Sequence, residues 1–251
     1  MTKPGFELDH VALGVARIAD AAPFVAGVLG GEEHGGGPSP GFRFFQWTFA
    51  GGGRLEILEP TGPPDGFLQR FLARRGPGVH HVTFKVPGLA EAAERARAAG
   101  YDVVGFLDDD PYWKECFLHP KQAQGIVVQL AEEHPRPPDA DPSSWPKIEL
   151  PPRPADAPPP VRLLALRLLA RDADAALRQW GALLGGEARS LEPGVVEFVY
   201  PRSPVRIVVE ARPDAEEGPS RIEIACERPW PDGGHEALGT RFVRCEPPAG
   251  G

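Results

Sequence analysis

The sequence has few cysteines: three among its 251 residues, at Cys116, Cys226 and Cys245. Their number is odd and their spacing does not match a zinc-binding pattern, which argues against a disulfide framework and against a cysteine-based metal site. We therefore expect all three to be small buried hydrophobic residues.

The sequence also lacks a basic excess and a long hydrophobic run. Its 27 Lys and Arg stand against 35 Asp and Glu, a formal net charge of -8, which argues against nucleic acid or an acidic membrane as a partner. Small molecules are the expected partners. No stretch approaches the roughly 18 apolar residues of a membrane span, and the opening MTKPGFELDH has no signal-peptide core. These features predict a cytoplasmic protein.

What the sequence does contain is a pattern of strands and helices that occurs twice. Alternation around His10 predicts a strand with Val11, Leu13 and Val15 on its core face. This strand is followed by a helix over 18–30, a glycine-rich loop able to hide one short strand, and strands over 42–49 and 54–60. The glycines at 35–37 and 51–53 are expected to form turns. After a short helix at 67–75, the second copy has a strand at 79–86, a helix at 88–100 and strands near 101–106, 114–120 and 125–132. The predicted fold class is α+β, built from tandem βαβββ modules.

The second half of the chain resembles the first. The stretch 134–160 is too rich in proline to continue a sheet and predicts an extended linker or a surface strap. Beyond it, ARDADAA at 170–176 repeats ARIADAA at 16–22, and LLGGE at 183–187 repeats VLGGE at 28–32. We predict paired modules over 1–133, a linker over 134–160 and degenerate modules over 161–251, the fourth with its helix shortened or missing.

Two histidines stand side by side in the strand GVHHVTFKV, at His80 and His81. Neighbouring residues of a strand point to opposite faces, so the two histidines have different surroundings. His80 shares its face with apolar residues and is expected to pack under a helix, whereas His81 shares its face with Thr83 and Lys85. His81 is therefore the candidate for chemistry.

Four polar residues occupy corresponding places in the two modules: His10 and His81 in the first strands, and Glu56 and Gln129 in the last strands. Imidazole nitrogens with carboxylate or amide oxygens suit a divalent first-row metal such as Zn, Fe, Co, Ni or Mn. Aligning the repeats places Leu164 and Val208 opposite His10 and Glu56, and places Glu223 and Val243 opposite His81 and Gln129. The C-terminal half is therefore expected to lack the metal site.

Several stretches are similar to strand motifs of the vicinal oxygen chelate superfamily, which includes the glyoxalases and dioxygenases. These stretches are LDHVALGV, RLEILEP, GVHHVTFKV and FLHPKQAQGIVVQL, and they most resemble methylmalonyl-CoA epimerases. The resemblance covers residues 6–132 and implies mixed sheets that curl around a metal. His10, Glu56, His81 and Gln129 fall on its ligand positions.

The sequence departs from these epimerases in two ways. Glu56 and Gln129 look exchanged between the modules, and the strand FRFFQWTF has no match for the separate glutamate base of some bacterial epimerases. Because an amide accepts no proton at neutral pH, either Glu56 is both ligand and catalytic residue or another residue moves the proton.

Three functions remain open. The first is a metal-dependent epimerase or isomerase that transfers a proton next to a carbonyl, with an acyl-CoA or similar thioester as the candidate substrate. The second is a non-heme iron dioxygenase of the extradiol type, since two histidines and one carboxylate can hold ferrous iron. The third is a metal-free protein that sequesters a drug or other small molecule. The chain is expected to be a monomer, with its second half in place of a second subunit, or a homodimer.

Overall fold

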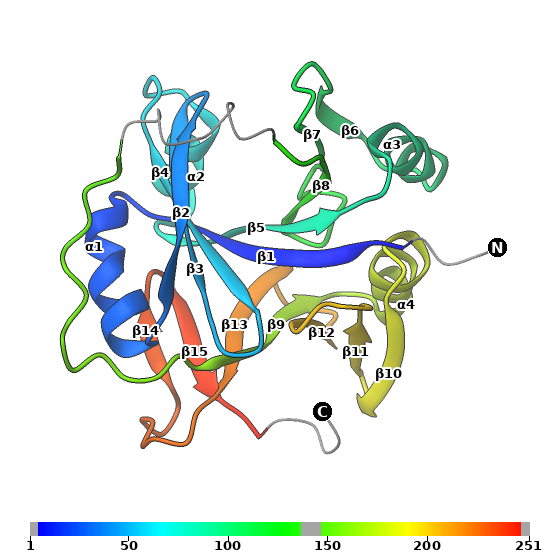
Figure 1. Cartoon of the computed structure of the whole chain (residues 1–251). Helices are drawn as coiled ribbons and strands as arrows, with labels where there is room; N and C mark the ends of the chain where they lie inside the picture. The colour runs from blue at the N-terminus through cyan, green and yellow to red at the C-terminus, as the bar shows by residue number, and fades with distance from the viewer. Residues whose placement is uncertain (1–4, 137–146, 247–251) are drawn as a thin grey trace. The chain divides into compact units, whose positions relative to one another are not determined.

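The computed structural model describes residues 5–136 and 147–246, and Figure 1 follows its elements along the chain. The first module consists of β1 (Glu7–Gly14), α1 (Ile18–Ala22) with its π-helical continuation η1 (Pro23–Val28), β2 (Glu32–Ser39), β3 (Phe42–Thr48) and β4 (Arg54–Pro60). After α2 (Phe67–Arg75), the second module consists of β5 (Gly78–Lys85), α3 (Leu89–Ala98), β6 (Val103–Leu107), β7 (Trp113–Leu118) and β8 (Val127–Glu133). Both modules have the predicted βαβββ order.

These modules form one eight-stranded mixed sheet in the order β2-β3-β4-β1-β5-β8-β7-β6. The first strand of each module pairs in parallel with its last, β1 with β4 and β5 with β8, while the remaining strands of each module pair antiparallel. This pairing places residues of the first and last strands side by side, as a site built from those strands requires.

The glycine-rich loop contains a full strand, β2, so the prediction that Gly35–Gly37 form a turn is wrong. A Cβ on Gly36 would lie 2.2 Å from the backbone oxygen of Phe44 on β3. Glycine therefore lets β2 approach β3 closely, although its low strand propensity hides the strand in the sequence. The other glycine run does turn the chain, with positive φ at Gly51 and Gly52.

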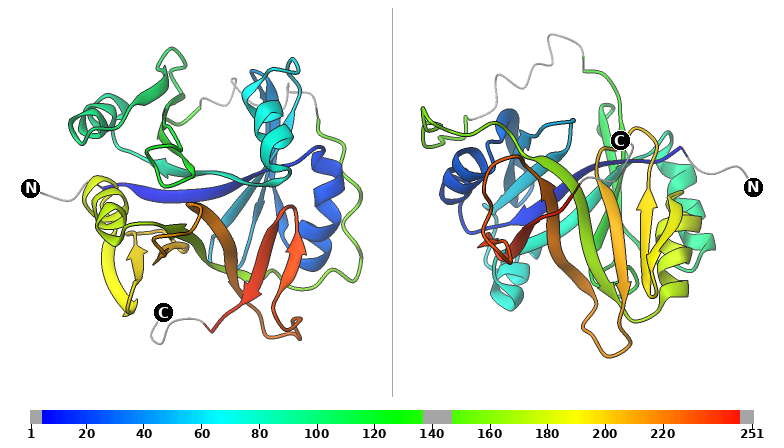
Figure 2. Two further views of the ribbon diagram at one scale, coloured as in Figure 1. Left: turned by 180° about the vertical axis from the view of Figure 1, so that it is seen from behind. Right: turned by 90° about the horizontal axis from the view of Figure 1, so that it is seen from below.

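The C-terminal half forms a second, seven-stranded sheet in the order β10-β11-β12-β9-β13-β15-β14, which can be followed in the two views of Figure 2. The third module has β9 (Arg162–Ala170), α4 (Ala173–Ala176) with its continuation η4 (Leu177–Leu183), β10 (Glu187–Glu192), β11 (Val195–Val199) and β12 (Arg206–Ala211). The fourth has β13 (Gly218–Ala225), β14 (His235–Ala237) and β15 (Thr240–Arg244), and no helix occurs within residues 218–246. The second half is thus a degenerate copy of the first.

The chain divides into two compact units, and each combines parts of both halves. The first comprises 1–10, 81–136 and 165–221; in it, Phe84 of β5 packs on Tyr200 and Trp180, with ring centroids 4.9 and 6.4 Å apart. The second comprises 11–80, 137–164 and 222–251; in it, Phe24 of η1 packs on Phe242 of β15 at 5.0 Å. The division at 133 and 160 stays a prediction.

Within the proline-rich stretch, residues 147–160 contain neither helix nor strand, as predicted, and residues 137–146 lie outside the described part of the chain. Arg153 donates to the backbone oxygen of Gly30 at 3.1 Å, and Val161 N donates to Leu29 O at 2.9 Å. A Cβ on Gly30 would lie 2.4 Å from the Pro158 oxygen, and its φ is +75°. Glycine at this position therefore lets the strap lie against the end of η1.

The three cysteines are free, but only Cys116 is buried. Cys226 and Cys245 are partly exposed, so the prediction that all three are buried is wrong for these two. Each follows the last residue of a strand, β13 or β15, where the sheet no longer covers the side chain.

Candidate metal centre

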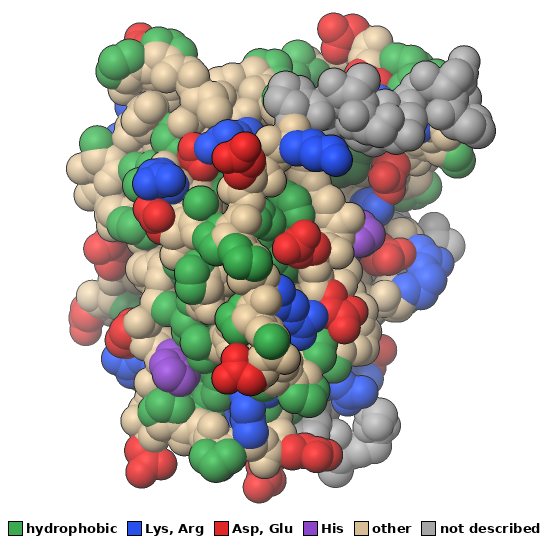
Figure 3. All heavy atoms as spheres, turned by 60° about the vertical axis from the view of Figure 1, so that its left-hand side comes forward, with side chains coloured by type: hydrophobic (Ala, Val, Ile, Leu, Met, Phe, Trp, Pro, Cys, Tyr) green, Lys and Arg blue, Asp and Glu red, His purple; other side chains and the backbone are tan. Residues whose placement is uncertain are grey.

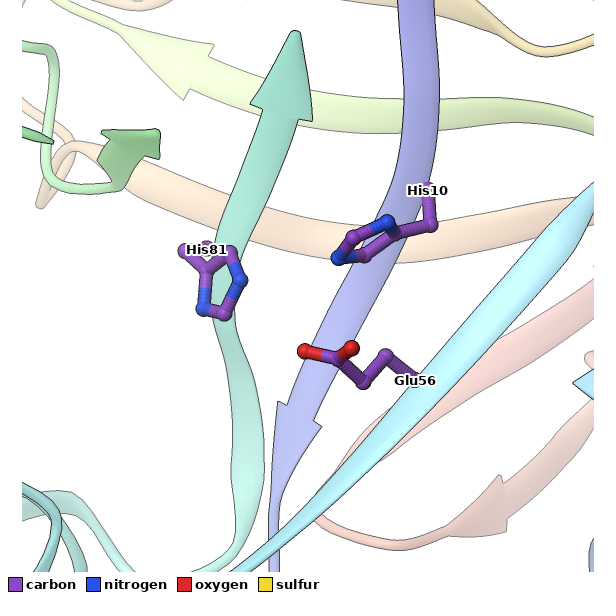
Figure 4. A group of neighbouring side chains, drawn as sticks. All are labelled: His10, Glu56 and His81. Carbon is purple, nitrogen blue, oxygen red and sulfur yellow. The ribbon is translucent and has the colours of Figure 1, made fainter. Parts of the chain in front are cut away.

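Three of the four predicted ligands lie together. His10 on β1, Glu56 on β4 and His81 on β5 are all buried, and one potential ligand atom from each lies within 4.8 Å of the other two. Figure 4 shows the two rings and the carboxylate directed toward one another. Nitrogen and oxygen ligands at about 2.1 Å from one ion lie within about 4.2 Å of each other, so small side-chain rotations would bring this group to metal-binding distances.

The strand register explains how Glu56 comes to this position. β1 and β4 pair in parallel with Ala12 opposite Glu56, and His10 shares a face with Ala12 because it lies two residues before it. On the other side of β4, Gln46 lies opposite Glu56 and donates from Nε2 to Glu56 Oε2 at 2.8 Å. This bond fixes one carboxylate oxygen.

A carboxylate orients the first histidine. Asp9 Oδ2 lies 2.7 Å from His10 Nδ1, the side chain of Asp9 is only 2% exposed, and Lys85 Nζ lies 3.2 Å from Asp9 Oδ1. A carboxylate only accepts hydrogen bonds, so the hydrogen of a neutral His10 is on Nδ1 and its Nε2 carries a lone pair. This is the tautomer that a metal ligand needs.

The fourth predicted ligand, Gln129, joins His10 through Thr83. The fully buried hydroxyl of Thr83 lies 2.9 Å from His10 Nε2 and 2.5 Å from Gln129 Oε1. With a neutral His10, both of these atoms are acceptors, and Thr83 has one hydrogen to offer. An imidazole nitrogen and an amide oxygen are both ligands that a divalent cation takes, so the donor set fits a metal.

The sequence did not reveal a carboxylate on the neighbouring strand. Glu115 of β7 accepts hydrogen bonds at Oε2 from Gln129 Nε2 at 2.6 Å and from Trp113 Nε1 at 2.8 Å. Because the carboxylate can only accept, the amide of Gln129 turns its nitrogen toward Glu115 and its oxygen toward Thr83. The sequence analysis did not identify four residues that contact the predicted ligands, namely Asp9, Thr83, Gln46 and Glu115. The only sequence signals for the first two were the position of Asp9 next to His10 and the strand face that Thr83 shares with His81.

His80 has different surroundings from His81. Its ring packs on Phe71 and Phe67 of α2, with centroids 4.9 and 5.5 Å apart, in agreement with the expected packing against a helix. Burial lowers the pKa of His80 to about 4, partly offset by the charge of Glu56. His80 is therefore neutral at physiological pH.

The C-terminal sheet does not repeat the ligand set, although two of the predicted correspondences are wrong. Glu197 of β11 lies opposite Val208 of β12, as Gln46 of β3 lies opposite Glu56 of β4, so Val208 corresponds to Glu56 as predicted. Val208 in turn pairs with Arg167 of β9, as Glu56 pairs with Ala12 of β1. Ala165, two residues before Arg167, therefore corresponds to His10, and the predicted Leu164 is one residue out of place. The motif repeat misled the alignment because the second copy has one residue fewer between its first strand and that motif.

The fourth module differs in the same way. Glu223 pairs with Val243, as Thr83 pairs with Gln129. Glu223 therefore corresponds to Thr83 and not to His81. Within residues 5–136 and 147–246, His10, Glu56 and His81 form the one cluster of potential His, Cys or carboxylate metal ligands.

Comparisons with known proteins agree with this geometry. A family model for the Glyoxalase/Bleomycin resistance protein/Dioxygenase superfamily matches residues 9–117. The uncharacterized protein YqjC of Bacillus subtilis is 31% identical over 134 residues, which cover 50% of this chain and 91% of that protein. An ethylmalonyl-CoA/methylmalonyl-CoA epimerase of Cereibacter sphaeroides is 31% identical over 133 residues, 50% of this chain and 96% of the relative.

The whole chain also has a structural counterpart. A hypothetical protein from Staphylococcus aureus matches 96% of this chain and 99% of its own, with a TM-score of 0.66 and 9% identity. At that identity the match shows the fold alone, but it extends over both halves. The sequence relatives, the curled mixed sheets and the repeated βαβββ modules together show that the chain belongs to the Glyoxalase/Bleomycin resistance protein/Dioxygenase superfamily.

Proposed function

We propose that this chain is a metal-dependent epimerase or isomerase that transfers a proton at a carbon next to the carbonyl of an acyl-CoA or similar thioester. The observation that carries the proposal is the buried group of His10, Glu56 and His81. The relative from Cereibacter sphaeroides, named as an epimerase of ethylmalonyl-CoA and methylmalonyl-CoA, supports the substrate class.

His10, His81, Glu56 and Gln129 would hold one divalent ion, with Co, Ni, Zn, Mn and Fe as candidates. Such an ion supplies Lewis acidity that polarises the substrate carbonyl. One carboxylate among three neutral ligands leaves the site net positive, which favours an enolate. Asp9 keeps the lone pair of His10 Nε2 available, and Gln46 fixes one oxygen of Glu56.

Glu56 is the proposed catalytic residue among these ligands. It is the carboxylate of the set, so it can exchange a proton with the substrate, whereas the amide of Gln129 cannot. Gln46 donates to Oε2 and so orients the carboxylate that we assign to metal binding and proton transfer.

The proposed partner is a small molecule. On the face drawn in Figure 3, basic and acidic side chains are interspersed and form no basic patch, in keeping with the net charge of -8. No helix in the described part of the chain is long and apolar enough to cross a membrane. We propose a monomer, because each compact unit already combines segments from both halves; a dimer mass in light scattering at micromolar concentration would contradict this.

An iron-dependent dioxygenase is the second candidate function, because His10, His81 and Glu56 are a two-histidine, one-carboxylate set. Coordination by Gln129 would fill one of the positions that oxygen and substrate need. A metal-free binding protein would have no use for two buried histidines and a buried carboxylate in one group, and we rank it last.

Solvent-deuterium exchange separates these functions. The metal-loaded protein is incubated in D₂O with methylmalonyl-CoA or ethylmalonyl-CoA, and mass spectrometry follows deuterium at the α-carbon. We expect exchange that depends on the metal and falls at least about 100-fold in Glu56→Gln, in line with loss of a general acid–base group. No exchange with either thioester, together with oxygen consumption on a catechol by the Fe²⁺ form, would favour the dioxygenase.

A further inference from the structure

Epimerisation removes a proton from one face of the substrate carbon and returns a proton to the other face, and the predicted ligand set has one carboxylate to do so. Gln129, at the position where the second module could supply another, cannot take a proton at neutral pH. The structure has a carboxylate one strand away, at Glu115 of β7. The inference below rests on the proposed function.

Glu115 reaches the site from the strand next to β8. In the antiparallel pairing of β7 and β8, Phe117 lies opposite Gln129 and Glu115 lies opposite Ala131. Glu115 and Gln129 therefore share one face as diagonal neighbours, within reach of a hydrogen bond. Their bond length is 2.6 Å, between Gln129 Nε2 and Glu115 Oε2.

The two oxygens of Glu115 have different partners. Both hydrogen bonds, from Gln129 and from Trp113, end at Oε2. Among the residues that the structure describes, no donor bonds to Oε1. The side chain is thus fixed by one oxygen while the other keeps its capacity to accept a proton.

A continuous set of polar contacts joins Glu115 to the candidate metal centre. It runs from Glu115 to Gln129, from Gln129 Oε1 to the hydroxyl of Thr83 at 2.5 Å, and from there to His10 Nε2 at 2.9 Å. All four residues belong to the same compact unit. Glu115 is therefore held next to the second module's ligand.

Each module carries one glutamate hydrogen-bonded to one glutamine on adjacent strands. In the first, Gln46 is on β3 and Glu56 on β4; in the second, Glu115 is on β7 and Gln129 on β8. The exchange of residue types seen in the sequence at Glu56 and Gln129 is thus accompanied by a second exchange on the neighbouring strands. Each module keeps one carboxylate.

We propose that Glu115 is the second proton-transfer residue of the site. Its Oε1 takes the proton from the α-carbon of one epimer; the C–H bond breaks and its electron pair moves into the thioester carbonyl, forming the enolate. Glu56, in its carboxylic form, returns a proton to the opposite face. Glu115 then holds the proton and Glu56 is ionised, which is the state that catalyses the reverse reaction, so protons and electrons balance.

The variant Glu115→Gln distinguishes a base from a positioning residue. Because both donors meet the same oxygen, one amide oxygen can accept both bonds, and the arrangement of Gln129 is preserved while the proton acceptor is lost. Each separate epimer of methylmalonyl-CoA is incubated with the metal-loaded variant in D₂O, and metal content is measured on the same sample.

We expect Glu115→Gln to lose exchange with one epimer by roughly 10²- to 10⁴-fold, the range for a general acid–base group, and to keep exchange with the other within about threefold. Its metal content should stay equal to that of the wild type. The matched control Glu94→Gln, at an exposed glutamate of α3 that contacts Arg97, should keep exchange with both epimers.

Two results would overturn the role of Glu115. Wild-type exchange with both epimers in Glu115→Gln would show that the residue moves no proton, and loss of both together with the metal would show that it only positions Gln129. If the wild type itself exchanges neither methylmalonyl-CoA nor ethylmalonyl-CoA, the proposed function fails, and the role of Glu115 fails with it.

Discussion

Asp9 and His10 are consecutive in β1, and yet their side chains meet, with Asp9 Oδ2 2.7 Å from His10 Nδ1. The contact places a buried carboxylate behind a candidate metal ligand, and Lys85 at 3.2 Å compensates the charge of Asp9. A partner of this kind orients the ring and raises its basicity.

We predict that Asp9→Asn weakens metal binding about 10- to 100-fold, the usual effect of losing such a partner. Asparagine can donate as well as accept, so it no longer enforces the tautomer with a free Nε2. Isothermal titration with Zn²⁺ or Co²⁺ measures the change. Glu133→Gln is the control, because Glu133 contacts Lys85 but not His10; an affinity equal to wild type in Asp9→Asn would show that Asp9 does not orient the ligand.

The neighbouring histidines should differ sharply on replacement. His81→Ala removes a ligand and should abolish tight metal binding, whereas His80→Ala removes a ring that packs on Phe67 and Phe71 and should retain the metal. Metal content by elemental analysis after dialysis checks both. Equal loss of metal in the two variants would contradict the assignment of the two faces.

Acid stability should depend on Glu132. This carboxylate accepts from Leu89 N at the start of α3 and contacts His134 and Lys114, and these bonds, that to Leu89 N first, lower its pKa from 4.5 to about 2. A lowered folded-state pKa means stability that is present above pH 4.5 and is lost as the pH falls through 2.

Glu132→Gln should accordingly reduce the free energy of unfolding by about 1.5 to 3 kcal/mol at pH 7, the range for hydrogen bonds to a charged group. The difference from wild type should shrink as the pH falls from 4.5 toward 2. Urea denaturation at a series of pH values measures it, and the control is Glu91→Gln in the first turn of α3, the helix whose start Glu132 binds. A difference that does not change with pH would count against the assignment.

The C-terminal half should stabilise the second module through Trp180. Trp180 is fully buried, packs near Phe84 and donates to Gln124 Oε1 at 3.0 Å. Trp180→Ala should cost about 3 to 5 kcal/mol of unfolding free energy, whereas Leu177→Ala, at a side chain 40% exposed, should change it by less than about 0.5 kcal/mol. Equal, small effects in thermal or urea unfolding would mean that the degenerate half adds no stability here.

Much of the fold could be predicted because both modules have clear periodicity and repeated motifs. β1, α2, β5 and α3 lie where alternation and helix signals place them. β2 was hidden because its glycines have no side chains to form an alternating pattern, although they let β3 approach.

The site was predictable only in part, because the sequence does not reveal the register in which the strands pair. His10, Glu56 and His81 stand out because polar residues on core strands are unusual. Glu115 does not stand out, since its strand WKECFL is mixed in polarity, and it joins the site only through the pairing of β7 with β8. For the same reason, because the register was not known, Leu164 and Glu223 were assigned to the wrong positions.

Titration of the metal-stripped protein with Co²⁺ tests the central claim most directly, because the absorption of bound Co²⁺ reports both stoichiometry and ligand geometry. We predict one Co²⁺ per chain in the wild type and none in His10→Ala or His81→Ala of unchanged circular dichroism. Failure of the folded wild type to bind Co²⁺, or binding that survives both substitutions, would contradict a metal centre at His10, Glu56, His81 and Gln129.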